Sequence, residues 1–100
     1  MDKWTPHYSL VAIVAMVEDL GVASFTKAAL DGGRAMGLTS PEMLAVVCGL
    51  TRAMFYKSMT TYSDHRIWQD VYHAPTPTGQ TAYIKVTLRD NAPVIQFKEK

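Results

Sequence analysis

Apolar residues in the first half of the chain follow the spacing of helices. Positions 10, 13, 14, 17 and 20 are apolar and recur at intervals of three and four, which places them on one helix face. Thr5 as N-cap, Pro6 at the first position and Gly21 after the last turn predict where this helix begins and ends. Because Val11 and Ala15 make the opposite side apolar too, we expect neighbouring elements or a partner to cover it.

Two more helices are predicted before residue 50. The second has Ser24 or Thr26 at its start and Gly37 at its end, and the third has Ser40 as N-cap and Gly49 after its last apolar turn. Residues after 53 are richer in Thr, Tyr, Ile and Val, which favour strands. We expect strands at 54–62, 66–72, 80–89 and 93–98, interrupted by turns at 63–65 and 74–79.

Helices followed by strands predict an α+β fold, with the helices packed on one face of a mostly antiparallel, twisted sheet. The length of 100 residues fits one domain over residues 1–100 and excludes a two-domain enzyme. The longest apolar run, residues 10–17, is much shorter than the roughly 20 residues that span a bilayer, so we expect no membrane anchor.

The sequence also predicts which residues of the last two strands pair with each other. Apolar and polar residues alternate strictly from Thr81 to Arg89, and Asp90-Asn91 tolerates the positive φ of a two-residue hairpin turn. This turn places Tyr83 opposite Lys98 on the wet face, whereas a slip of one residue would bring a charged side chain opposite the core.

Charge is divided unevenly along the chain. Residues 51–100 carry seven Lys and Arg against four Asp and Glu, whereas residues 1–50 carry three against five, so an anionic partner should meet the second half. Cys48 is the single cysteine, which excludes an internal disulfide and fits a reducing, cytoplasmic compartment. No His or Cys spacing indicates a metal site, and no glycine-rich phosphate loop is present.

The expected pair of Tyr83 and Lys98 has two interpretations. It is either an ordinary solvated strand face or a site for phosphate chemistry, in which lysine supplies charge and tyrosine binds, stacks or exchanges a proton. Of the neighbours Trp68 and Gln69, we expect the indole to be the buried one because of its size.

Residues 56–72 (YKSMTTYSDHRIWQDVY) resemble the signature of the MqsR family, the motility quorum-sensing regulator toxins. Thr5-Pro6-His7, Tyr83-Ile84-Lys85 and Phe97-Lys98-Glu99-Lys100 match as well, so that the resemblance spans nearly the whole chain. It implies a RelE-like fold and a type II toxin that cleaves mRNA without a metal or other cofactor, preferring GC-containing trinucleotides. It also implies a zinc-containing, DNA-binding antitoxin, MqsA, through which alone operator DNA would be contacted.

The resemblance assigns candidate site residues. The family's proposed catalytic positions match Lys57, Gln69, Tyr83 and Lys98. We further expect RNA contacts from five residues: His7, Met59, Arg66, Lys85 and Arg89. The family usually carries several Lys or Arg in its first helix, whereas this chain is apolar there.

A mechanism follows from these residue types. The RNA 2′-hydroxyl attacks the adjacent phosphorus, Lys57 and Lys98 neutralise the phosphorane, Tyr83 exchanges a proton or positions the phosphate, and Gln69 orients by hydrogen bonds. The general acid and base stay unassigned, because a tyrosine with a pKa of about 10 is a poor base at neutral pH. The alternative is a noncatalytic RNA- or protein-binding module.

Overall fold

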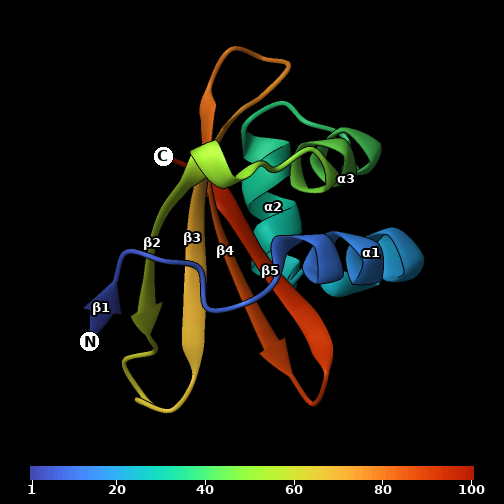
Figure 1. Cartoon of the computed structure of the whole chain (residues 1–100). Helices are drawn as coiled ribbons and strands as arrows, with labels where there is room; N and C mark the ends of the chain where they lie inside the picture. Colours follow the sequence, from blue (N-terminus) through green and yellow to red (C-terminus); the bar gives the residue numbers. More distant parts are fainter.

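A computed structural model describes residues 1–100 and shows an α+β architecture, as the sequence predicts (Figure 1). Five strands form one antiparallel sheet in sequence order, and three helices lie on one of its faces. The strands are β1 (Asp2–Lys3), β2 (Phe55–Thr60), β3 (Trp68–Pro75), β4 (Thr81–Arg89) and β5 (Ala92–Glu99). The helices are α1 (Leu10–Leu20), α2 (Lys27–Ala35) and α3 (Ser40–Cys48), with short 3-10 turns at Gly21–Ser24 and Arg52–Met54. This arrangement is the one expected of a RelE-like fold.

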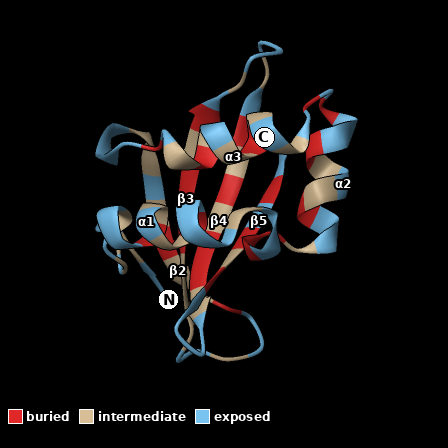
Figure 2. Ribbon diagram, turned by 90° about the vertical axis from the view of Figure 1, so that its right-hand side faces the viewer, coloured by how far each residue is buried: buried red, intermediate tan, exposed pale blue.

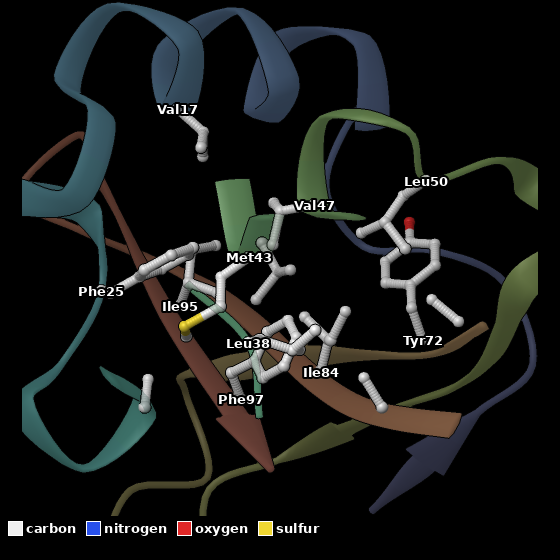
Figure 3. Close-up of a cluster of buried hydrophobic side chains, with 14 of the residues drawn as sticks. Val17, Phe25, Leu38, Met43, Val47, Leu50, Tyr72, Ile84, Ile95 and Phe97 are labelled. Carbon is white, nitrogen blue, oxygen red and sulfur yellow. The ribbon is translucent and has the colours of Figure 1, made fainter. Parts of the chain in front are cut away.

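The hydrophobic core fills the space between the helices and the sheet. With the helices facing the viewer, buried residues lie on the strands behind them and on the sides of the helices that face the sheet (Figure 2). Met43 and Val47 of α3 pack with Ile84, Ile95 and other side chains of the sheet (Figure 3). The helices therefore cover one face of the sheet and leave the other open.

The predicted β4–β5 hairpin is confirmed residue by residue. Asp90 and Asn91 have φ values of 52° and 62°, as a two-residue turn of this kind needs. Tyr83 pairs with Lys98 and Ile84 pairs with Phe97, so the apolar side chains face the core and the polar pair faces outward.

The first helix begins later than predicted, and the third begins one residue earlier. The first starts at Leu10 with Ser9 as N-cap, and the expected start at Thr5-Pro6 is wrong because the backbone of residues 7 and 8 hydrogen-bonds to Asp70 instead. The third is capped by Thr39 rather than Ser40, since Glu42 completes a capping box with Thr39: each residue's side chain accepts from the other's backbone N–H, at 2.8 and 3.2 Å. The second helix has the expected Thr26 cap.

The strands exist as predicted, but some limits move. β3 runs to Pro75 instead of ending near residue 72, because Ala74 and Pro75 still pair with β4. β2 ends at Thr60, where Thr61 accepts from the Asp64 backbone N–H at 3.0 Å and turns the chain. The two-residue strand β1 was not predicted, since two residues have no recognisable hydrophobic period.

Helix α2 lies directly against the edge of β5, beside it in both views (Figures 1 and 2). Phe25 forms a parallel bridge with Ile95, and the Thr26 N–H donates to the Ile95 carbonyl at 3.2 Å. A Cβ on Gly32 would collide with the Phe97 carbonyl oxygen. The glycine therefore permits the close approach that shields this strand edge.

The outer side of α1 is not covered by other elements. Ile13 and Val17 are buried against the core, whereas Val11 is 83% exposed and Ala12 and Ala15 are exposed as well. Packing within the chain is therefore excluded for Val11, and the expectation that a partner covers this side stays a prediction.

We expect Ile13→Ala to lower the free energy of unfolding by about 2–5 kcal/mol, because it removes a fully buried side chain and leaves a cavity. Val11→Ala should change stability by less than about 0.5 kcal/mol, because the side chain is exposed. Urea unfolding of both variants tests the assignment of the two faces, and equal losses would contradict it.

Candidate active site

The face of the sheet that the helices leave open carries the candidate catalytic residues. Strand pairing places the side chains of Val71, Tyr83, Lys85 and Lys98 opposite to the core side, on which Tyr72 and Ile84 lie. Each of β2 to β5 contributes one of the predicted catalytic residues to this face: Lys57, Gln69, Tyr83 and Lys98, in that order.

Two of the four lie close together, with Lys85 as a third neighbour. The Lys98 Nζ atom is 5.3 Å from the centroid of the Tyr83 ring, and the Lys85 Nζ atom is 6.0 Å from it. Burial and the charge of Lys98 lower the pKa of Lys85. These two ammonium groups therefore make a concentrated positive region beside a phenol.

Lys57 and Gln69 share the face but stand apart from this cluster. Strands in a sheet are about 4.8 Å apart, and Lys57 on β2 aligns with Gln96 on β5, two residues from Lys98. The backbones of Lys57 and Lys98 are therefore separated by roughly 16 Å. Lys57 also forms an ion pair with Asp2 at 3.3 Å. Gln69 lies opposite Met59, a predicted RNA contact, and both are half-buried.

A histidine that is not among the predicted catalytic or RNA-binding residues lies next to Tyr83. His73 is the cross-strand partner of Tyr83 with ring centroids 5.4 Å apart, and on its other side it stacks on Tyr56 at 4.5 Å. Its Nε2 atom is buried without a hydrogen-bond partner. Burial and the charge of Lys100 lower its pKa, which favours the neutral imidazole. Gln69, Val71 and His73 are alternate residues of one strand, so the sequence does indicate that His73 shares a face with Gln69.

Asp70, on the core side of the sheet, holds the N-terminal segment. Its buried carboxylate accepts hydrogen bonds from the backbone N–H groups of His7 and Tyr8, at 3.0 and 2.9 Å, and from the Ser58 hydroxyl at 2.6 Å. The segment that leads from β1 to α1 passes in front of β2 and β3 in Figure 1 and is fixed at this point. Asp70 therefore joins β2, β3 and the start of the chain.

The expectation that Trp68 is buried is wrong, because Trp68 and Gln69 are both half-buried. Trp68 begins β3 and is covered in part by the N-terminal segment: His7 stacks on it at 5.3 Å and the Lys3 Nζ atom lies 4.2 Å from its ring centroid. The Lys3 Nζ atom also forms a hydrogen bond with His7 Nδ1 at 2.8 Å. Burial and the charge of Lys3 lower the pKa of His7. The predicted RNA contact His7 thus lies apart from Tyr83, next to Asp70.

The two predicted arginine contacts lie towards the opposite end of the strands. Arg89 is six residues beyond Tyr83 along β4, which corresponds to about 20 Å. Arg66 is exposed in the β2–β3 loop and paired with Asp64 at 3.1 Å, which holds the pKa of that carboxyl below its usual range. The charge of Arg89 also acts on Asp64, so both arginines lie near the β2–β3 loop and away from the Tyr83 cluster.

No group of three or more His, Cys, Asp and Glu side chains comes together in the structure. No helix is both long and apolar enough to cross a bilayer. The groups gathered on the open face are instead amines, a phenol, an imidazole and amides, which suit proton exchange and the binding of phosphate.

Comparison with known proteins shows the family of this chain. The family model described as "Motility quorum-sensing regulator, toxin of MqsA" matches residues 5–99. The chain belongs to this family. It is similar to the mRNA interferase toxin MqsR of Escherichia coli (strain K12), with 44% identity over 100 residues that cover both chains completely. The resemblance seen in the sequence is therefore confirmed, and the matched range includes all four predicted catalytic positions of this MqsR-family toxin.

The lowered pKa values of His7 and His73 predict how stability depends on pH. Below a pH of about 6.5 the unfolded chain takes up protons that the folded imidazoles resist, so unfolding becomes easier as the pH falls. We expect a lower Tm at about pH 5.5 than at about pH 7.5, and a smaller difference in the variant His73→Phe, which keeps the ring stack. Thermal unfolding followed by circular dichroism measures both values, and an unchanged pH dependence in the variant would remove His73 from this explanation.

Proposed function

We propose that this chain is a toxin of a type II toxin–antitoxin system that acts as an endoribonuclease on mRNA and so inhibits translation and growth. Two findings support the proposal: the family to which the chain belongs and the name of its Escherichia coli relative, an mRNA interferase. The observation that carries the chemistry is the cross-strand pair of Tyr83 and Lys98 on the open face, with Lys85 beside it.

Cleavage proceeds by attack of the RNA 2′-oxygen on the adjacent phosphorus. The 2′-hydroxyl loses its proton, the new O–P bond forms a phosphorane, and the bond from phosphorus to the 5′-oxygen breaks as that oxygen gains a proton. The products are a 2′,3′-cyclic phosphate and a 5′-hydroxyl, and no metal takes part. The preferred sites are GC-containing trinucleotides.

One residue from each of four adjacent strands serves this reaction. Lys98 stabilises the charge that develops on the phosphorane, and Tyr83 positions the phosphate or exchanges a proton. Lys57 and Gln69, nearer the other edge of the same face, supply charge and hydrogen bonds to the RNA on that side of the pair. Lys85, Met59, His7, Arg66 and Arg89 make the remaining RNA contacts.

The partner that neutralises this toxin is an MqsA-like antitoxin that contains zinc and binds DNA, and operator DNA is contacted only through it. The family description, "toxin of MqsA", supports this partner. The pair acts in the cytoplasm, in keeping with the single reduced Cys48.

We expect Lys98→Ala to lower the cleavage rate by about 10²–10³-fold, the usual loss when one charge-stabilising donor leaves a preorganised site. RNA binding should fall much less, since other bases remain. Arg34→Ala, which removes an exposed positive charge from α2, is the control and should cleave normally. Rates are measured with a purified protein and a short RNA.

The same assay separates the two proposed functions. Fragments formed in EDTA at the rate seen without it support metal-independent cleavage, whereas activity lost in EDTA and restored by magnesium would overturn it. Tyr83→Phe retains the ring, so a large loss of rate with binding kept assigns the role to the hydroxyl. Absence of cleavage by the wild-type protein, with RNA binding intact, would favour the noncatalytic module.

The exposed side of α1 is the surface we assign to the antitoxin. Val11→Lys and Ala15→Glu should weaken association without lowering the Tm, because both side chains are exposed. Titration of labelled toxin with purified antitoxin measures the Kd. An unchanged Kd would place the antitoxin on another surface.

A further inference from the structure

A groove of about 400 Å³ lies between the first turn of α2 and the open face of β4 and β5. Helix residues form one wall, and side chains of the two strands form the floor and the other wall. The lining consists of Thr26, Ala28, Ala29, Tyr83, Lys85, Gln96, Phe97 and Lys98. The proposed catalytic pair is thus part of the groove rather than of a flat surface.

We propose that this groove binds one nucleobase of the substrate RNA, next to the scissile phosphate, and that the Gln96 side chain recognises the hydrogen-bonding edge of that base. The inference rests on the proposed cleavage at Tyr83 and Lys98. It adds a specificity-determining residue, Gln96, which lies outside the catalytic set.

The walls of the groove suit a flat ring. His73 lies on the β3 side of the Tyr83 ring, and Lys98 and the groove lie on the β5 side. A base on that side stacks on the phenol, an interaction common in the recognition of single-stranded RNA. The facing residues Ala28 and Ala29 are small, which leaves room for the base, and a volume of 400 Å³ is within the usual range for a bound small molecule.

The charge of the lining matches an RNA strand. It contains two lysines and no carboxylate. The ion pairs of the structure join Arg34 to Asp31, Lys57 to Asp2 and Arg66 to Asp64, so Lys85 and Lys98 are left free for phosphate groups. A base in the groove is therefore attached to a backbone phosphate that these lysines can reach.

Gln96 has the chemistry and the place to read the base. It is exposed, lines the groove and is the cross-strand neighbour of Lys85. A carboxamide offers both a donor and an acceptor, so it forms paired hydrogen bonds that differ from one base to another. Stacking on Tyr83 holds any base, whereas the amide distinguishes among them.

The first test fills the groove. Ala28→Leu should lower kcat/KM for a short RNA by about tenfold to a hundredfold, the effect of a misfitting methylene group or more in a binding pocket. Ala35→Leu makes the same change at an exposed position in the last turn of the same helix and should cleave normally. Circular dichroism confirms that both variants are folded.

The second test asks what Gln96 selects. A pool of RNAs with every base at each position is cleaved by wild-type protein and by Gln96→Ala, and the ends are mapped by sequencing. The variant should lose about tenfold to a hundredfold of discrimination at a single position next to the cleaved bond, which corresponds to the loss of one paired hydrogen-bond contact. A merely structural role would lower cleavage at all sites equally and would overturn the assignment.

Other outcomes separate this inference from the proposed function. If Lys98→Ala is inactive but Ala28→Leu and Gln96→Ala cleave with the wild-type rate and profile, the groove is no base pocket while the active site stands. If Lys98→Ala cleaves normally, the proposed function itself fails. If Ala28→Leu cleaves normally but escapes neutralisation by the antitoxin, the groove binds a protein segment and the proposal is overturned.

Discussion

The pairing of β4 with β5 is the constraint on which both the core and the candidate site depend. Positive φ values at Asp90 and Asn91 close a two-residue turn, and that turn fixes every opposite pair in the hairpin. Because side chains alternate between faces, one register buries Ile84 with Phe97 and at the same time places Tyr83 beside Lys98. Burial of the apolar face thus sets the geometry of the polar one.

The edge of β5 is a second point at which stability and function meet. An uncovered strand edge invites pairing with other chains, and α2 covers this one at close range. Gly32 makes that approach possible, although glycine is a poor helix former. The same contact brings Ala28 and Ala29 to the border of the open face and so creates the groove beside Tyr83. A helix whose first role is to protect the sheet therefore also forms a wall of the proposed base pocket.

A buried carboxylate fixes the N-terminal segment at the point where it leads into α1. Asp70 accepts from two successive backbone N–H groups and from Ser58, so its charge is compensated inside the fold. It directly follows Gln69, whose side chain points to the other face of the same strand. The position of Gln69 on the open face is in this way linked to the packing of the chain's first residues.

The sequence by itself determined the elements whose signals are local. The helical spacing of apolar residues, the alternation of Thr81–Arg89 and the turn at Asp90-Asn91 act within a few residues, so the α+β class, the hairpin register and the Tyr83–Lys98 pair follow from them. The signature of residues 56–72 likewise identified the family that the comparison shows.

Tertiary structure alone decided what depends on contacts between distant residues. Asp70 draws residues 7 and 8 out of the predicted first helix, and the N-terminal segment, not the core, covers Trp68. The stack of His73 between Tyr56 and Tyr83 joins three strands, and the groove at Gln96 needs α2 to dock on β5. Such contacts leave no periodic trace in a single sequence, because they are set by how elements far apart in the chain pack against one another.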